Sequence, residues 1–369
     1  MSARRIPFLA LTPGEDARDV AAAIDRVIER GWFVLGPEVE AFEAEFARAS
    51  GAAHAVGVGN GTDAIALTLR ALGIGAGDEV ITSPLSAAFS ALAVMMTGAR
   101  PVFADVDPDR LTIDPRRIED AVSPRTRAIL PVHLYGQAAD MPAIERIAVK
   151  HGLAIVEDCC QAHLAACNQR PVGTMGLAGA FSFYPTKNLG ALGDGGAVVT
   201  NDRALADRLR RLRNGGQSSH YRHDEFGVNS RLDELQAAIL RARLAHLPRW
   251  TARRRAIAAR YRRQLDGVDA ALVRVLPECD AGHVYHLFAV RSRSRAALQQ
   301  HLAAQGVDTL IHYPIPLSRQ GAFGGTAPAA CAEADRACAE VLSLPLHPAL
   351  ADGDVDAIAA TVKETSCVR

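Results

Sequence analysis

The chain has 369 residues and a mass of 39.2 kDa, which is long for a single hydrophobic core and favours two domains. Its 41 basic residues are balanced by 41 acidic ones, so no net charge would attract nucleic acid or an anionic membrane. No apolar run is long enough to span a bilayer, and residues 1–7 are not followed by the apolar core of a secretory signal. We therefore expect a soluble, cytoplasmic, globular protein.

The first part of the chain alternates apolar runs with amphipathic ones. Two helices are expected first, at 15–30 and 37–49. The expected strands that follow are 53–58, 79–82, 101–103, 128–131 and 154–156. The helices expected between them are 62–72, 86–96, 114–121 and 141–151. This alternation predicts an α/β fold with a mostly parallel sheet that is covered on both faces.

The pattern changes after residue 158. We expect adjacent strands at 178–184 and 195–200, followed by a helix at 202–213. Another helix is expected from 233 to about 246, where Pro248 interrupts it, and it resumes through 263. A strand at 286–291 and a helix at 295–304 come later. We predict a domain boundary near residue 246, with a large domain at 1–246 and a smaller C-terminal domain at 247–369.

The seven cysteines indicate a reducing compartment, because their number is odd and none forms a C-x-x-C pair. One cluster contains Cys159, Cys160, His163 and Cys167. A zinc site would need a second pair at ligand spacing, so we expect no metal there.

A glycine-rich turn, Gly57 to Asp63, stands between a predicted strand and a predicted helix. Such a turn exposes backbone N–H groups at the positive end of a helix, which suits a phosphate. Thr62 occupies the sixth position, where a dinucleotide-binding G-x-G-x-x-G motif would have glycine. A plain tight turn is the alternative interpretation.

Two acids, Glu157 and Asp158, follow the strand expected at 154–156. Ligand sites of open α/β sheets lie at the carboxyl ends of strands. A carboxylate at that position can keep a cationic ring nitrogen protonated, because opposite charge stabilises the charged form. A capping or ion-paired role is the alternative, and it suits Glu157 better than Asp158.

Lysine is scarce in this chain, since arginine supplies all but three of the basic residues. One of the three, Lys187, lies just past a predicted buried strand, in the run Ser182 to Gly190. Lysine can form an imine and can lose its proton near neutral pH, which arginine cannot do. Ser182 could contribute a hydroxyl to the same phosphate as the glycine turn.

A polar loop, Gly227 to Asp233, opens the helix expected from 233. Asn229 or Ser230 could cap that helix, or the loop could reach the site of a neighbouring chain. Together the four features provide an anion-binding turn, a carboxylate, a reactive lysine and a hydroxyl, which are the groups that bind pyridoxal 5'-phosphate.

With these residues in view, the chain resembles the DegT/DnrJ/EryC1/StrS family of sugar aminotransferases, within the fold-type I, aspartate aminotransferase-like enzymes. The resemblance covers nearly the whole chain. It rests on runs at 35–43, 59–64, 157–163, 181–196, 229–238 and 312–317, of which the lysine run FSFYPTKNLGALGDGG is the most specific. It implies a large domain with a mostly parallel sheet and a smaller C-terminal α+β domain.

The resemblance also implies roles for single residues. Lys187 would carry the Schiff base and move protons, and Asp158 would pair with the pyridine nitrogen of pyridoxal phosphate. The other implied cofactor-binding residues are Gly61, Thr62, Phe89, Gln161, Ser182 and Asn229, the last supplied by the other subunit of a homodimer. The implied substrate-binding residues are His163, Tyr184, Tyr221, His223 and Tyr313.

The chain departs from the family pattern at two positions. The family often has an aromatic residue that stacks on the cofactor ring, but the corresponding position here is Ala87, and Phe89 is the nearest aromatic. The residue after His163 is Leu164, where the family more often has glycine.

The function implied is a ping-pong transfer of an amino group from an amino acid, expected to be L-glutamate, to a nucleotide-linked keto sugar. A keto-cyclitol or a related antibiotic precursor is the alternative substrate. A dehydratase branch of the family has histidine in place of the lysine, so Lys187 argues against dehydration.

Two other classes of protein would fit part of the sequence. An NAD-dependent oxidoreductase would use the glycine turn with Asp78 or Glu79 on the ribose, but it leaves the lysine run unexplained. A regulator without catalytic activity would keep the fold and sense a ligand, and Lys187 together with Asp158 argues against it.

Overall fold

The computed structural model describes residues 5–270, 272–323 and 330–364, and confirms the α/β fold. Its central sheet has seven strands in the order β1-β9-β8-β5-β4-β2-β3. Their bounds are β1 His54–Val58, β2 Glu79–Thr82, β3 Arg100–Phe103, β4 Thr126–Leu130, β5 Ala154–Asp158, β8 Ala178–Ser182 and β9 Gly196–Thr200. Strand β9 runs antiparallel to both β1 and β8, and the other pairs are parallel, so the sheet is mostly parallel as predicted.

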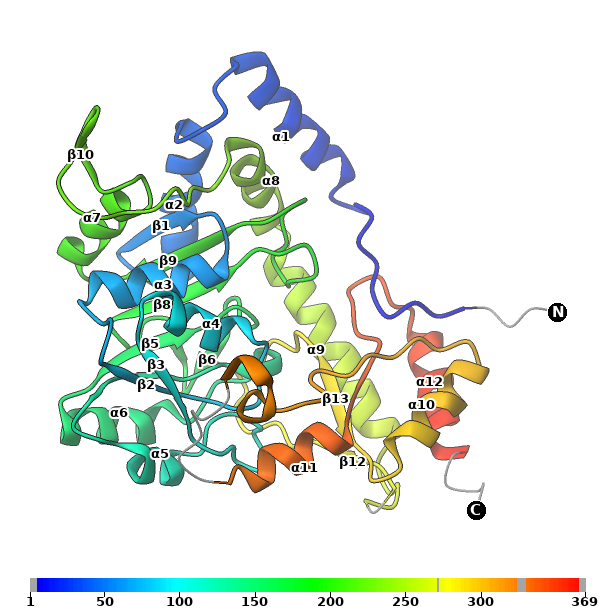
Figure 1. Ribbon diagram of the computed structural model, residues 1–369. Coiled ribbons are helices and arrows are strands. Elements are labelled where there is room, and N and C mark those ends of the chain that lie inside the picture. The colour runs from blue at the N-terminus through cyan, green and yellow to red at the C-terminus, as the bar shows by residue number, and fades with distance from the viewer. Residues whose placement is uncertain (1–4, 271, 324–329, 365–369) are drawn as a thin grey trace.

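Helices cover both faces of this sheet (Figure 1). One face packs against α2 (Pro37–Ala49), α5 (Pro115–Ala121), α6 (Met141–His151) and α8 (Glu234–Leu244). The other face packs against α3 (Gly61–Ala71), α4 (Phe89–Met96) and α7 (Arg203–Leu212). Successive residues of a strand point to opposite faces, so Ile155 joins the first core and Val156 the second. An N-terminal helix, α1 (Ala17–Arg30), packs on α8.

The C-terminal part forms a separate core around an antiparallel sheet of β12 (Arg274–Val275), β13 (Phe288–Arg291) and β14 (Val341–Leu344). Its helices are α9 (Leu247–Gln264), α10 (Arg295–Ala304), α11 (Ala332–Glu340) and α12 (Asp352–Glu364). Figure 1 shows α9 running from the large sheet toward β13, α10 and α12. The predicted boundary near residue 246 falls in the turn between α8 and α9 and stays a prediction.

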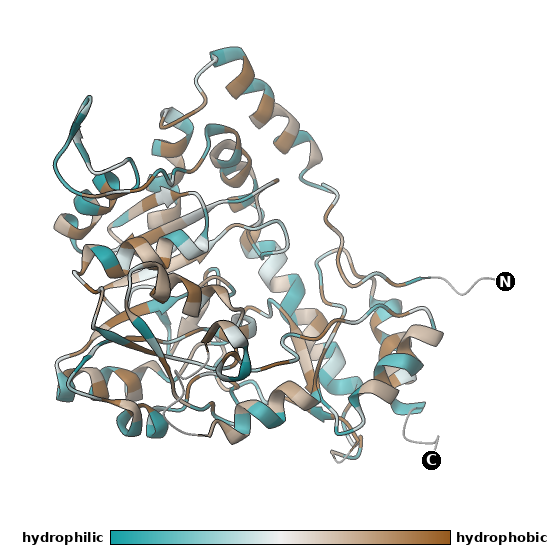
Figure 2. Cartoon of the chain, in the orientation of Figure 1, coloured by the Kyte–Doolittle hydropathy of each residue, from teal (hydrophilic) through white to brown (hydrophobic). Residues whose placement is uncertain are grey.

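Short elements complete the fold. They are the strand pairs β6 (Ala166–Cys167) with β7 (Arg170–Pro171) and β10 (Gln217–Ser219) with β11 (Arg222–His223), and the 3-10 turns at 134–136, 317–319 and 321–323. The β10–β11 hairpin belongs to a hydrophilic loop that stands out from the molecule (Figure 2). Among the described residues, no helix is both long and apolar enough to cross a membrane.

Local chemistry explains where the elements begin. Helix α3 starts at Gly61 because the Asn60 side chain accepts a hydrogen bond from the Asp63 N–H, at 2.8 Å. The helix predicted from residue 86 begins only at Phe89. The Ser83 hydroxyl accepts a hydrogen bond from the Leu85 N–H, which holds the chain in a turn before the helix starts.

Candidate active site

The candidate site lies where strands β1, β8 and β5 end at the same edge of the sheet. Val58, the last residue of β1, and Ser182, the last of β8, both lie opposite Gly196 of β9. Asp158 ends the neighbouring strand β5. The fold therefore brings the glycine turn, the acid and the lysine run together, as expected for the carboxyl ends of strands.

Gly61, Thr62 and Ser182 form a small polar corner at the start of α3. A Cβ atom on Gly61 would lie 2.7 Å from Ser182 Cβ and 2.7 Å from Cys160 Sγ, so only glycine fits there. In the described part of the chain, the N–H groups of Gly61 and Thr62 have no hydrogen-bond partner. These two donors open the positive end of α3 and lie beside the Ser182 hydroxyl, which is the chemistry that a phosphate needs.

Asp158 is a buried carboxylate. One oxygen accepts a hydrogen bond from the Ser90 hydroxyl at 2.6 Å, and the other accepts one from the Cys160 N–H at 3.0 Å. Within the described residues it has no ion-pair partner. A buried carboxylate that lacks a cation fits a ligand that brings one.

Lys187 follows β8 in a loop, and its backbone N–H donates to the Tyr184 carbonyl at 2.8 Å. Burial lowers the pKa of its amine, and the electrostatic influence of the neighbouring Cys160 and Asp158 offsets this only in part. A lysine whose pKa is lowered by burial has a larger fraction of free amine at neutral pH, which is the form that attacks a carbonyl.

Gln161 and Tyr313, predicted from distant parts of the sequence, are in contact. The Gln161 amide donates to the Tyr313 hydroxyl at 3.0 Å, and its carbonyl accepts from the Tyr135 N–H at 2.8 Å. Burial raises the pKa of Tyr313 to about 12, so its hydroxyl stays protonated. Both side chains are thus fixed before any ligand arrives.

His163 is fully buried rather than open to solvent. Its ring packs 5.6 Å from that of Phe181 and 5.7 Å from that of Phe183, and its Nε2 lies 2.9 Å from the Ser182 carbonyl oxygen. Burial lowers its pKa to about 3, so the ring is neutral. In this position it supports the strand that carries Ser182, and its predicted contact with substrate stays untested.

The remaining predicted residues lie on the surface of the single chain. Phe89 begins α4 and is 62% exposed, directly before the buried Ser90. Tyr221 and His223 lie on or next to the β10–β11 hairpin, and Tyr221 is 82% exposed. Asn229 and Tyr184 are exposed as well. No contact within the chain joins Tyr221, His223 or Asn229 to Lys187 in the described residues.

Three residues of the site, Ser90, Tyr135 and Asn188, were not predicted from the sequence. Ser90 hydrogen-bonds Asp158, and its hydroxyl also lies 3.1 Å from that of Ser86, four residues earlier and before the start of α4. Asn188, next to Lys187, donates to the Val284 carbonyl at 3.1 Å. The available signal was the spacing of Ser86 and Ser90, which would share one side of the helix expected at 86–96.

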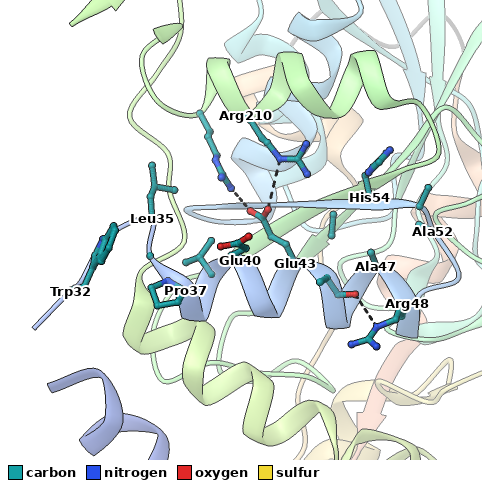
Figure 3. Close-up of a pocket in the computed structure, with 16 residues that line it drawn as sticks. Trp32, Leu35, Pro37, Glu40, Glu43, Ala47, Arg48, Ala52, His54 and Arg210 are labelled. Atoms are coloured by element: carbon teal, nitrogen blue, oxygen red, sulfur yellow. Dashed lines mark hydrogen bonds and ion pairs between the residues drawn. The ribbon is translucent and has the colours of Figure 1, made fainter. Parts of the chain in front are cut away.

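A hollow of about 840 Å³ lies away from the candidate active site, along α2, β1 and α7 (Figure 3). Figure 3 shows Arg210 reaching Glu43 across it, and Arg213 also bonds to Glu43. None of the predicted site residues lines this hollow.

The fold and the site, with a lysine beyond β8 and a buried carboxylate at the end of β5, define a fold-type I, aspartate aminotransferase-like protein. Within that class the chain belongs to the DegT/DnrJ/EryC1/StrS aminotransferase family, whose model matches residues 15–363. The chain is therefore an aminotransferase, and the oxidoreductase alternative is set aside. Glu79 also argues against that alternative, since it begins β2 at the opposite edge and pairs with Arg100 and Arg125.

Relatives and solved structures agree with this assignment. The chain is 51% identical over 351 residues to dTDP-3-amino-3,4,6-trideoxy-alpha-D-glucose transaminase of Streptomyces venezuelae, covering 94% of this chain and 92% of the relative. The structure of S. venezuelae DesV in complex with a ketimine intermediate has a TM-score of 0.94 and 48% identity, over 99% of both chains. NtdA of Bacillus subtilis, solved with bound cofactor PMP, has a TM-score of 0.90 and 31% identity, over 98% of this chain and 85% of NtdA.

Proposed function

We propose that this aminotransferase uses pyridoxal 5'-phosphate to move an amino group from L-glutamate to a keto sugar linked to a nucleoside diphosphate. The observation that carries the proposal is the juxtaposition of Lys187, the buried carboxylate of Asp158 and the N–H groups at the start of α3, the last two without an ion-pair or hydrogen-bond partner, respectively, among the described residues. The sugar class is supported by the transaminase of S. venezuelae that is 51% identical to this chain.

The residues present fit the cofactor. Gly61, Thr62 and Ser182 would hold its phosphate, Asp158 would face its ring nitrogen, and Gln161 would lie near its phenolic oxygen. Phe89 remains our proposed ring contact, since Ala87 cannot stack. When bound, pyridoxal phosphate supplies an electron sink that stabilises negative charge on the substrate carbon.

The chain itself supplies proton transfer and orientation. The Lys187 amine, with its lowered pKa, would take a proton from the donor carbon and return one to the acceptor carbon. Hydrogen bonds from the Ser90 hydroxyl and the Cys160 N–H hold the Asp158 carboxylate in place. Tyr135 and Tyr313 fix Gln161 in the same way.

We also propose a cytoplasmic homodimer with the active site at the subunit interface. Asn229, Tyr221 and His223 are exposed in the single chain, and a partner would bring them to the site of the other subunit. Such a contact would also cover large apolar side chains that are exposed in the single chain. They include Trp32, Phe33, Phe89, Met96, Tyr184 and Phe226.

The first test is the visible absorption spectrum of the purified protein before and after addition of L-glutamate. We expect a cofactor band that L-glutamate converts to the amine form and that the variant Lys187→Ala lacks. Lys150→Ala is the matched control, because Lys150 is exposed and pairs with Glu119 at the surface. A band unaffected by L-glutamate would exclude that donor, and the absence of a band after soaking in pyridoxal phosphate would refute the proposal.

The second test is transfer of the amine to a keto sugar. The amine form is mixed with a dTDP-linked 3-keto-deoxysugar or with a keto-cyclitol, and the return of the first band is followed. Return with the nucleotide sugar alone supports the proposal. Return with the cyclitol alone would replace the sugar by the alternative substrate.

A further inference from the structure

Ser230 is a buried side chain to which the proposed function gives no role. It belongs to the loop Gly227 to Asp233 and directly follows the exposed Asn229. Its side chain is 2% exposed, and its hydroxyl contacts Gly59, which lies 171 residues earlier in the chain. Buried polar side chains are nearly always hydrogen-bonded, so the partners of this hydroxyl indicate what it holds in place.

The Ser230 hydroxyl holds the glycine turn on both sides of the proposed phosphate contacts. It accepts a hydrogen bond from the Gly59 N–H at 2.9 Å and donates one to Asp63 Oδ2 at 2.6 Å. Gly61 and Thr62 lie between these two points, and their N–H groups have no partner in the described part of the chain. One hydroxyl therefore fixes the segment that would orient both donors toward a phosphate.

A buried ion pair fixes the strand that leads into the same turn. Gly57 belongs to β1, which is an edge strand of the sheet. Its N–H donates to Glu43 Oε1 at 2.8 Å, and its carbonyl accepts from Arg213 Nη1 at 2.7 Å, so two side chains take the place of a neighbouring strand. The backbone carbonyl of Arg213 accepts from the Ser230 N–H at 2.9 Å. The turn and the loop of Ser230 thus share one anchor.

Asn229 faces the opposite way from Ser230. Residues 228–230 lie antiparallel to residues 212–215 and are joined to them by backbone hydrogen bonds of 2.8–2.9 Å. Successive side chains of an extended segment point to opposite sides, which agrees with a buried Ser230 and an exposed Asn229. The same short segment therefore carries an inward hydroxyl on the glycine turn and an outward amide.

We propose that Ser230 is a positioning residue that links the two cofactor sites of the homodimer. Its hydroxyl holds the phosphate-binding turn of its own subunit. Its peptide bond to Asn229 holds the side chain that serves the cofactor site of the partner subunit. The inference rests on the proposed function, because it requires both the cofactor and the homodimer.

The first test compares pyridoxal phosphate with pyridoxal, which lacks the phosphate, by titrating the cofactor-free protein and following the cofactor band. We expect Ser230→Ala to bind pyridoxal phosphate about tenfold more weakly, because two hydrogen bonds that hold the turn are lost. Its affinity for pyridoxal should not change, since pyridoxal has no phosphate for the turn to bind. Unchanged binding of pyridoxal phosphate, or equal weakening of both probes, would overturn the inference.

Ser50→Ala is the matched control. Ser50 is also 2% exposed, but its hydroxyl has no hydrogen-bond partner among the described residues. Its variant is expected to bind both probes as the wild type does. If Ser230→Ala fails to fold, Ser230→Cys takes its place, because a thiol fills a similar space but is a weak donor and a weak acceptor.

The second test uses mixed dimers to separate the two sites. A subunit with Lys187→Ala gives no cofactor band, so the band of a mixed dimer reports only the site of the other subunit. Ser230→Ala is placed either on the subunit that keeps Lys187 or on the subunit that lacks it. We expect about tenfold weaker binding of pyridoxal phosphate in the first case, and about threefold in the second, where only Asn229 is affected.

The reference is the mixed dimer that carries Lys187→Ala without Ser230→Ala. If this reference dimer does not form or shows no band, the proposed homodimer or cofactor is refuted, and the inference with it. If it shows a normal band, weakening that is absent from either of the two Ser230→Ala dimers would refute the inference alone. Weakening in both would establish that Ser230 acts on its own site and on that of the partner.

Discussion

Replacing Glu157 by glutamine removes one charge and exchanges one oxygen for an amide nitrogen, at a fully buried position. One carboxylate oxygen accepts from the Met175 and Gly176 N–H groups, at 2.8 and 2.7 Å. The other accepts from the Gly173 N–H at 2.8 Å and lies 2.9 Å from His133 Nε2. His133 Nδ1 accepts from the Ala139 N–H, so the ring proton is on Nε2 and that nitrogen also donates.

Glutamine cannot satisfy these four donors in either orientation of its amide. Its NH₂ group must face two of them, which leaves two buried N–H groups without an acceptor. Each such group costs about 1–3 kcal/mol, so the free energy of unfolding is expected to fall by about 2–6 kcal/mol. These four hydrogen bonds occupy the lone pairs of Glu157, which a metal held by His133, Glu157 and Cys159, three groups that lie close together, would need.

The assay is urea unfolding of the cofactor-free protein, followed by circular dichroism. Glu145→Gln is the control, because Glu145 forms a surface pair with Arg170 that is worth under about 1 kcal/mol. A Glu157→Gln protein that unfolds at the same urea concentration as the control would refute this account of Glu157.

Three further predictions concern the site itself. Asp158→Asn is expected to fold normally, because asparagine can keep both hydrogen bonds. Its turnover should fall roughly 10²–10³-fold because the charge is lost. Turnover near that of the wild type would contradict the role assigned to Asp158. Gly61→Ala is expected to weaken the binding of pyridoxal phosphate and to lower the free energy of unfolding by about 1–3 kcal/mol, because the new Cβ would overlap Ser182 and Cys160. Calorimetric titration with the cofactor measures the first effect, and urea unfolding measures the second. Burial lowers the pKa of Lys187 below its usual 10.5, so the unfolded chain binds the proton more tightly. The free energy of unfolding of the cofactor-free protein should therefore rise with pH through the range between the lowered pKa and 10.5, and this rise should disappear in Lys187→Met.

Much of the large sheet could be predicted from the sequence, because each buried strand is a short apolar run bounded by polar or glycine residues. Helices α1, α2 and α6 were predicted to within a few residues, since capping residues such as Pro37 and Gly31 mark their ends. The start of α4 was misplaced because the side chain of Ser83 forms a local turn, which periodicity does not reveal.

The site was predictable only where a residue type is rare or a motif is specific. Lys187 is one of three lysines, and the run around it is characteristic of the family. Ser230 was expected only as one possible cap of the helix from 233, and nothing in the sequence indicates that its hydroxyl bonds to the glycine turn. That contact arises when the loop at 227–233 packs against Gly59 and Asp63, which belong to a distant segment.

The adjacent acids at the end of β5 constrain how this protein can evolve. Because neighbouring strand residues face opposite sides, a single insertion within β5 would exchange the environments of Glu157 and Asp158. The same insertion would remove the hydrogen bonds between Glu157 and the turn at 173–176 and would move the Asp158 carboxylate out of the candidate site. Sequence drift in this strand is therefore limited to substitutions, whereas the segment between Cys160 and Gly173 can change length, provided that the returning turn still reaches Glu157. Divergence in substrate choice should accordingly be sought in loop lengths and not in the strand.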